Sequence, residues 1–323
     1  MEIAQLKNLI NKIKKQRPRI LVFGDIMLDE YIEGKVERIS PEAPVPILSY
    51  NNTKKVLGGA GNVASNLINL GASVLIGSII GKDNDGLTIK SLLRSKNVAI
   101  SGLFETSNIC STKKTRFISK STQLLRLDND SKGIKKEDYK TFQNRINKLL
   151  SKIDCLIISD YNKGVCQKEI VREVIKHVKS KNIPIFIDPK GSSWSKYKFA
   201  TCITPNKKEI QQYLGYSLKN ESEFKNAAKY VIKKLNIDSC LITKGDEGMS
   251  LYTENLTYHQ SVNKKEVYDV SGAGDTVIAC FALSRCVNLD FETSIKLSTS
   301  ISSEVVTHLG TTPFHYRMLN ANK

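Results

Sequence analysis

The sequence has few of the residues and motifs that bind metals or form disulfides. Its four histidines are dispersed without metal-ligand spacing, and its seven cysteines include no Cys-x-x-Cys pair. Cysteines such as Cys155 lie inside apolar runs, which indicates reduced core thiols. No apolar run approaches the length of a membrane span, and no signal-peptide core precedes Arg17. We therefore expect a cytoplasmic protein without a zinc site, disulfides or membrane contact.

The chain also lacks the features that would turn its positive charge into a nucleic-acid site. The formal net charge is +17, but the lysines are scattered along most segments, and no arginine-rich arm or aromatic-interleaved basic stripe occurs. We expect no nucleic-acid partner, and the charge would at most attract anionic substrates. Hydrophobic residues make up 40% of the sequence, which is enough for a sizeable core.

What the chain does have is a regular alternation of buried strands and amphipathic helices. Short apolar runs predict strands, and segments with apolar residues three or four apart predict helices. The strands are expected at 19–23, 72–80, 154–159, 184–187, 200–204 and 238–243. The helices are expected at 2–15, 59–70, 85–95, 136–151, 167–180, 206–214 and 221–235. This pattern predicts an α/β fold with a mostly parallel central sheet and helices on both faces.

Two segments break the alternation, at about 31–50 and 110–128, and contain short strands without intervening helices. They predict a small β-sheet that could close over a site as a lid. The 323 residues could hold one large or two ordinary domains, but no linker or repeat divides them. We interpret residues 1–323 as a single domain with this lid.

Polar or glycine-rich residues follow the apolar runs at the point where each predicted strand ends. Because ligands of open parallel sheets bind beyond the carboxyl ends of the strands, these residues predict one functional rim. The segments are Gly24-Asp25 with Asp29, Ser159-Asp160-Tyr161, Asp188-Pro189-Lys190-Gly191, Thr204-Pro205-Asn206 and Thr243-Lys244-Gly245.

The sharpest motif is Asp269-Val270-Ser271-Gly272-Ala273-Gly274-Asp275, followed by an apolar helical run. A glycine turn that opens a helix lets backbone amides approach an anion, and the helix dipole adds positive potential there. Asp275 would lie in the first turn, where it could accept a proton from an attacking hydroxyl. An ordinary glycine turn with a dipole-stabilising Asp is the simpler explanation for a bare Gly-x-Gly-Asp, but the rim favours the catalytic interpretation.

This motif resembles the C-terminal signature of the ribokinase-like (PfkB-type) carbohydrate kinases. Gly58-Gly59-Ala60-Gly61-Asn62 resembles their N-terminal signature, and the likeness covers essentially the whole chain. The resemblance implies a ribokinase-like fold, ATP and Mg²⁺, an anion hole at Gly272, Ala273 and Gly274, and Asp275 as catalytic base. It also implies a homodimer formed through the lid, and it leaves a monovalent-cation requirement open.

A narrower resemblance is to the D-glycero-D-manno-heptose 7-phosphate kinases. It rests on the segments 24–29, 38–46, 114–116, 123–128, 159–164 and 188–191. It implies phosphorylation of the anomeric C1 hydroxyl to give the 1,7-bisphosphate, in the synthesis of activated heptose for surface polysaccharide. Many such kinases are fused to a nucleotidyltransferase. No His-x-x-His motif occurs here, so we expect that step on another polypeptide.

The candidate substrate-binding residues fall into two groups. Asp25, Asp29, Gly59, Asn62, Asp160 and Lys163 could contact sugar hydroxyls. Arg38, Lys82, Arg116 and Arg126 could hold a phosphate, although surface charge explains Lys82 equally well. The segment 59–64 also fits the Gly-x-Gly-x-x-Ala pattern of dinucleotide folds. We reject that interpretation because residues 51–57 make a poor preceding strand.

The candidate nucleotide-binding residues lie further along the chain: Lys190, Asn206, Thr243, Lys244, Gly245 and Gly248. Asn206 and Glu209 would hold Mg²⁺ through water, and the same pair could equally form a helix capping box. A hairpin turn is the competing explanation for Lys244. Two other functions remain open: a kinase of the same type acting on another sugar, sugar phosphate or nucleoside, and a non-catalytic sugar or nucleotide sensor.

Overall fold

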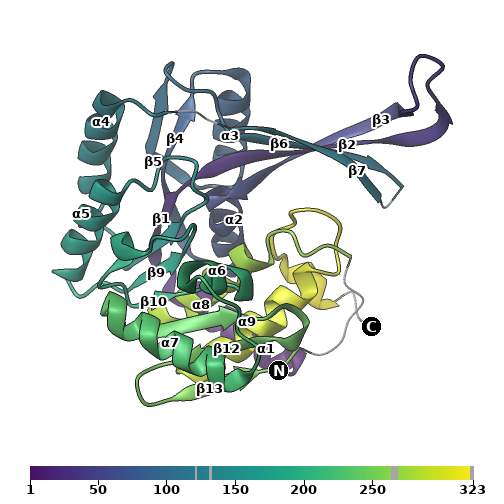
Figure 1. Ribbon diagram of the computed structural model, residues 1–323. Coiled ribbons are helices and arrows are strands. Elements are labelled where there is room, and N and C mark those ends of the chain that lie inside the picture. Colours follow the sequence, from purple (N-terminus) through teal and green to yellow (C-terminus); the bar gives the residue numbers. More distant parts are fainter. Residues whose placement is uncertain (121, 131–132, 263–267, 321–323) are drawn as a thin grey trace.

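The computed structural model describes residues 1–120, 122–130, 133–262 and 268–320 (Figure 1). Its helices are α1 (Ile3–Gln16), α2 (Ala60–Leu70), α3 (Asn84–Ser95), α4 (Lys136–Asn147), α5 (Lys168–Lys179), α6 (Lys207–Leu214), α7 (Glu221–Leu235), α8 (Ala273–Cys286) and α9 (Phe291–Val305). The central strands are β1 (Arg19–Gly24), β4 (Ser73–Gly81), β5 (Ala99–Thr106), β8 (Cys155–Ser159), β9 (Ile185–Asp188), β10 (Cys202–Ile203), β11 (Ser239–Thr243), β12 (Met249–Tyr252) and β13 (Thr257–Gln260).

Within the described residues these strands form one nine-stranded sheet in the order β13-β12-β11-β10-β9-β8-β1-β4-β5. The strands from β11 to β5 are parallel, and β12 and β13 are antiparallel. Side chains of α1, α2, α3, α8 and α9 pack into one hydrophobic core and those of α4 to α7 into another, so helices cover both faces. The predicted α/β class is confirmed.

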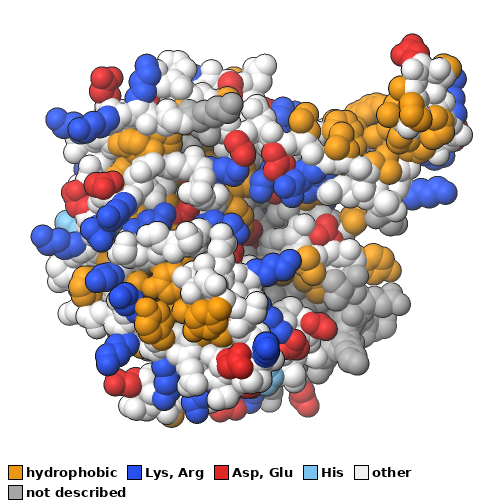
Figure 2. Space-filling view, viewed as in Figure 1, with side chains coloured by type: hydrophobic (Ala, Val, Ile, Leu, Met, Phe, Trp, Pro, Cys, Tyr) orange, Lys and Arg blue, Asp and Glu red, His pale blue; other side chains and the backbone are white. Residues whose placement is uncertain are grey.

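A second, four-stranded sheet, which we call the lid sheet, is built from β2 (Ile26–Ile39), β3 (Pro46–Gly59), β6 (Lys113–Ser119) and β7 (Thr122–Asn129). Its order is β3-β2-β6-β7, and the β2–β3 hairpin projects away from the body (Figure 1). Apolar side chains gather on this projection (Figure 2), and its strands carry Ile39 and Tyr50, which are 60% and 67% exposed.

The lid strands are longer than the sequence predicted. The expectation that residues 51–57 make a poor strand was wrong. Residues 51–57 do form a strand, because they pair with β2 along most of its length. Their polar composition fits a strand that is largely exposed. The dinucleotide interpretation still fails, because β3 is antiparallel to β2 and belongs to the lid sheet, so no parallel β-α-β unit includes it.

The structure also contains elements that the sequence pattern did not indicate: β5, β13 and α9. The helix expected at 136–151 ends at Asn147. Among the described residues, no helix is long and apolar enough to cross a bilayer. All seven cysteines are free thiols.

Candidate active site

The predicted rim runs along one edge of the central sheet. Strands β11, β10, β9, β8 and β1 are consecutive neighbours, so the polar residues that follow them lie side by side. The lid sheet meets this edge at β1, since only Asp25 separates β1 from β2. The N-terminus of α8 completes the rim and brings Asp275 to it.

Asp275 is 2% exposed and has a donor on each carboxylate oxygen. Asn62 Nδ2 donates to Oδ2 at 2.8 Å, and the Tyr161 hydroxyl donates to Oδ1 at 2.8 Å. These donors come from α2 and from the loop after β8, so three distant segments converge on one carboxylate. Asp275 therefore has a fixed orientation.

Burial raises the pKa of Asp275 to about 6, and the negative charge of Asp29 adds to this rise. The hydrogen bonds from Asn62 and Tyr161 and the positive charge of Lys114 oppose it. A carboxylate with this pKa is ionised at neutral pH yet basic enough to take up a proton, as a general base must be.

The glycine turn before α8 provides an open approach to backbone amides. Gly272 has φ of 80°, and a Cβ there would lie 2.5 Å from Asn62 Nδ2, so no side chain fits without moving Asn62. A Cβ on Gly274 would meet nothing within 4 Å, so this position faces open space. The amide of Ala273 already donates to the Val270 carbonyl at 3.2 Å. Of the predicted anion hole, Gly272 and Gly274 are therefore better placed than Ala273.

The carboxylate of Asp25 does not face a free site, contrary to the role predicted for it. It is 1% exposed and accepts the backbone amides of Tyr161, Lys163 and Val165 at 2.8, 3.1 and 2.9 Å. Asp25 thus holds the loop that carries Tyr161. Gly59 supports the same arrangement, since a Cβ there would lie 2.5 Å from the Asp25 carbonyl and 3.4 Å from the Tyr161 ring.

Asp29 forms an ion pair with Arg116 on the inner face of the lid sheet. Arg116 Nη1 lies 2.7 Å from Asp29 Oδ1, and the guanidinium lies over the Tyr31 ring at 5.2 Å. Thr311 closes the network, because its Oγ1 donates to Asp29 Oδ2 at 3.1 Å. Arg116 is 8% exposed and is anchored by Asp29.

Register places further cations on the same face of the lid sheet. Strand pairing places Asp29 on β2, Lys114 on β6 and Asp128 on β7 side by side. Two residues further along β6, Arg116 pairs with Arg126 on β7. Side chains two residues apart on a strand point to the same face, so these residues share one face of the lid sheet. The Lys114 ammonium lies 5.6 Å above the Tyr161 ring, and burial lowers its pKa. Arg126 is exposed and binds Asp128 through two nitrogens at 2.8 and 3.0 Å.

Two predicted phosphate contacts are not joined to this cluster. Arg38 lies nine residues beyond Asp29 on the same strand, about 30 Å away at the usual rise of a β-strand, so it is far from this cluster within one chain. Lys82 follows β4 with an exposed side chain, and within the described residues its amide donates to the Thr106 carbonyl, away from Asp275. Lys163 is held by Asp130, 2.5 Å from its ammonium.

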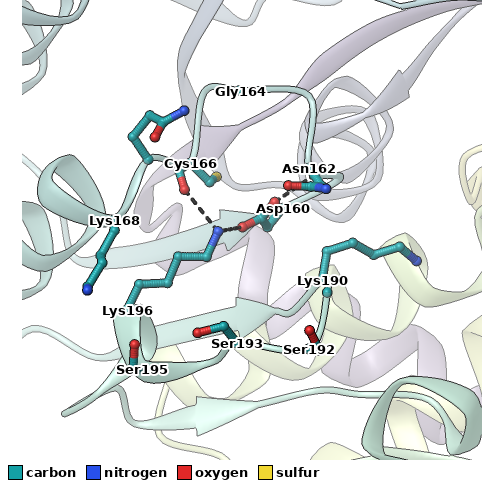
Figure 3. Close-up of a pocket in the computed structure, with 12 residues that line it drawn as sticks. Asp160, Asn162, Gly164, Cys166, Lys168, Lys190, Ser192, Ser193, Ser195 and Lys196 are labelled. Carbon is teal, nitrogen blue, oxygen red and sulfur yellow. Dashed lines mark hydrogen bonds and ion pairs between the residues drawn. The ribbon is translucent and has the colours of Figure 1, made fainter. Parts of the chain in front are cut away.

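A cavity of about 390 Å³ lies between the loops after β8 and β9 (Figure 3). Asp160 lines it but is 2% exposed and fully engaged: the Lys196 ammonium, the Tyr197 hydroxyl and the Asn162 amide all bind its oxygens. Figure 3 shows Lys196 reaching to Asp160 and to the Cys166 carbonyl. The sugar-binding role predicted for Asp160 is therefore replaced by a loop-fixing one.

The Asn206 and Glu209 pair forms a capping box at α6. Asn206 Oδ1 accepts the Glu209 amide at 2.9 Å, and Glu209 Oε2 accepts the Asn206 amide at 3.0 Å. Lys190 donates to Glu209 Oε1 at 2.8 Å. Burial, then the charges of Glu209 and Asp275, raise the pKa of Asp188 well above its ordinary value. This surplus of negative oxygens fits a hard divalent cation such as Mg²⁺.

The loop after β11 carries four of the predicted nucleotide-binding residues: Thr243, Lys244, Gly245 and Gly248. Thr243 forms an isolated parallel β-bridge with Asn206. Gly245 and Gly248 have φ of 64° and 90° in the turn that follows. The Lys244 side chain turns inward and is 3% exposed, with Glu221, Ser250 and Tyr252 around its ammonium. Lys244 is thus unavailable to a nucleotide.

Sequence reasoning left Tyr161, Lys114, Asp188 and Thr311 out of the site. The first three stand in segments that were singled out as motifs. For Tyr161 and Asp188 the available signal was their position at strand ends, and for Lys114 it was the segment 114–116. Thr311 gave no signal, because it reaches Asp29 from 282 residues away along the chain.

Comparisons with known proteins identify the family of this chain. Residues 17–315 match the pfkB family carbohydrate kinases. The chain is 38% identical over 296 residues to the bifunctional protein HldE of Aliarcobacter butzleri, and 40% identical over 299 residues to that of Sulfurimonas denitrificans. These matches cover 91% and 92% of this chain but 62% of each relative, so the chain spans about three fifths of their length.

Solved structures share the fold at low sequence identity. Phosphofructokinase-2 from Escherichia coli in complex with potassium has a TM-score of 0.79 at 18% identity, covering 94% of this chain and 97% of its own. Arabidopsis thaliana ribokinase complexed with ribose and ATP has a TM-score of 0.72 at 18% identity, with the same coverage. The fold is ribokinase-like, and the chain belongs to the pfkB family of carbohydrate kinases.

Proposed function

We propose that this chain transfers a phosphoryl group from ATP to the anomeric C1 hydroxyl of D-glycero-D-manno-heptose 7-phosphate. The observation that carries the phosphotransfer is Asp275, fixed by Asn62 and Tyr161 beside the open backbone at Gly274. The choice of sugar rests on the resemblance of the lid and rim motifs to heptose 7-phosphate kinases. It is supported by the cations that line the lid sheet next to Asp275.

In this proposal Asp275 removes the proton of the C1 hydroxyl as that oxygen attacks phosphorus. Its two donors hold one lone pair on each oxygen, so the remaining lone pairs are directed to the substrate. Because burial raises its pKa to about 6, Asp275 is ionised above pH 6 and accepts the proton without an intermediary. No covalent enzyme intermediate is needed.

The α8 N-terminus stabilises the charge of the transferring group. The first amides of a helix have no intrahelical acceptor, and Gly272 and Gly274 expose them without side chains. A bound Mg²⁺, held near Asp188 and through water by Asn206 and Glu209, would neutralise phosphate charge. Thr243 and Gly245 would border the nucleotide.

The 7-phosphate would bind to the inner face of the lid sheet. Arg116 is anchored by Asp29, so it offers its remaining guanidinium donors in a fixed geometry. Lys114 lies on the same face with its ammonium over Tyr161. Arg126 would exchange Asp128 for the phosphate, and the lid would exclude water.

The test is ADP release with ATP, Mg²⁺ and K⁺ on a panel of D-glycero-D-manno-heptose 7-phosphate, sedoheptulose 7-phosphate, fructose 6-phosphate and ribose. The proposal expects turnover with the manno-heptose phosphate, lost roughly a thousandfold in Asp275→Asn. Arg116→Glu should abolish activity on that sugar. Turnover with another sugar alone would reject the heptose assignment, and an absence of turnover would favour a sensor.

Two further expectations belong to this proposal. A cytoplasmic homodimer would form through the exposed apolar residues of the lid sheet. Nucleotidyl transfer would be carried out outside these 323 residues, since they contain no His-x-x-His motif.

A further inference from the structure

The loop from Asp160 to Val165 is held in place from three directions. Asp25 accepts three of its backbone amides, Lys196 binds Asp160, and the Tyr139 hydroxyl donates to the Gly164 carbonyl at 2.8 Å. A loop with this many contacts has little freedom to move. Its one aromatic side chain at the rim, Tyr161, is therefore presented to Asp275 in a defined position.

The Tyr161 hydroxyl can act only as a donor to Asp275. Burial, then the negative charges of Asp275 and Asp188, raise the pKa of Tyr161 well above its ordinary value, so the phenol keeps its proton. The 2.8 Å contact with Oδ1 is thus a hydrogen bond to the ionised carboxylate. Such a bond favours the charged form of its acceptor.

Lys114 reinforces this donor from above the ring. Its ammonium lies 5.6 Å from the ring centroid, within the range of a cation–π contact. A cation over the face withdraws electron density from the phenol and makes its O–H a stronger donor. Lys114, Tyr161 and Asp275 thus form a chain that leads from the lid sheet to α8.

We propose that Tyr161 is a positioning residue for phosphoryl transfer, which orients the Asp275 carboxylate through Oδ1 and favours its ionised form. The inference rests on the proposed role of Asp275 as base and adds Tyr161 as a residue that holds this base in place. Tyr161 does not touch the reacting atoms; it acts through Asp275.

The role of Tyr161 can be measured in the pH profile of kcat/KM. Its acid limb, where activity falls as the pH is lowered, follows protonation of the Asp275 carboxylate in the free enzyme. The groups that face Asp275 are Asn62 on α2, Tyr161, Asp29 on β2, Lys114 on β6 and Asp188 at the end of β9. Substitution of Tyr161 changes only one of them. Tyr161→Phe removes a donor to the charged form, so the limb should move upward by about one pH unit. At pH 6.5 kcat/KM should fall several-fold more than at pH 8.5.

Tyr139→Phe is the matched control. It removes a hydrogen bond from a tyrosine to the same loop, but that bond reaches the Gly164 carbonyl and not Asp275. The limb should stay where it is in the wild type. If both variants move the limb equally, loop rigidity explains the effect and the specific role of Tyr161 is rejected. If neither moves it, the inference is also rejected.

A second substitution guards against a folding defect in Tyr161→Phe. Site-specific 3-fluorotyrosine at position 161 keeps the shape but makes the phenol more acidic and a stronger donor, so the limb should move downward. An unmoved limb would overturn the inference. Asp275→Asn distinguishes a failure of the proposed function from a failure of this inference. If Asp275→Asn keeps full activity, the proposed base is wrong. If Asp275→Asn is inactive but Tyr161→Phe leaves the acid limb unshifted, only the inference is rejected.

Discussion

Ionisation of Asp275 opposes folding, because the carboxylate is buried and its pKa is raised from 3.8 to about 6. The folded state binds this proton more tightly than the unfolded state, so the cost is absent below pH 3.8 and complete above pH 6. The full cost of ionising Asp275 in the folded state amounts to roughly 3 kcal/mol of unfolding free energy. Relative to Asp275→Asn, the wild type should therefore lose about 2 kcal/mol of unfolding free energy between pH 4.5 and 7.5. Urea denaturation of both proteins at these pH values measures this difference, and a difference that stays constant would contradict the raised pKa.

Lys244 should be important for stability and unimportant for nucleotide binding. Its ammonium is buried among Glu221, Ser250 and Tyr252, and Lys244→Met would leave these groups without their donor. Since Glu221 is partly exposed to water, we expect a loss of about 2 kcal/mol and a KM for ATP within twofold of the wild type. Lys207→Met, which breaks the more exposed pair with Glu247, is the control and should cost little. A large rise in the KM for ATP in Lys244→Met would restore the nucleotide-binding role.

The sequence could predict where the charged residues of the site stand, but not which groups bind their carboxylates. Asp25, Asp29 and Asp160 all stand at or just beyond strand ends, and all three were reasonable sugar ligands. The structure distinguishes them, because Asp25 is taken by backbone amides and Asp160 by Lys196, whereas Asp29 faces Arg116. These partners lie 87 or more residues away for Asp25 and Asp29, and no local pattern encodes them.

At the scale of elements, the start of α8 separates a conformational need for glycine from a functional one. Gly272→Ala places a methyl group 2.5 Å from Asn62 Nδ2 in a backbone with φ of 80°, so it should lower both the melting temperature and kcat. Gly274→Ala meets no atom within 4 Å, so it should fold normally, yet its methyl group would occupy the space that a phosphate needs. Melting curves and kcat for the two variants check this. Full activity in Gly274→Ala would mean that the phosphate lies elsewhere.

The continuous apolar strands of the central sheet were predictable, whereas the lid strands and helix α9 were not. The strand expected at 19–23, which is apolar at every residue after Arg19, is β1. The lid strands carry polar residues because much of β3 faces solvent, so their pattern gave no clear boundaries. Helix α9 was missed because seven of its fifteen residues are serine or threonine, which favour helices weakly; packing against α8 stabilises it instead.

At the scale of the whole molecule, the lid sheet carries an apolar surface that no other part of the described chain covers. Leu125 and Leu127 are 60% and 59% exposed, and they lie on the face of β7 opposite Arg126. If the lid forms a homodimer, this face would be covered and the wild type would have twice the 36.1 kDa mass of the chain in light scattering. Leu125→Lys combined with Leu127→Lys should then give a folded monomer, because two buried charges would oppose association. Leu87→Lys, an equally exposed leucine on α3, should leave the dimer intact. A wild type that is monomeric at micromolar concentration, or a double variant that still dimerises, would place the interface elsewhere or remove it.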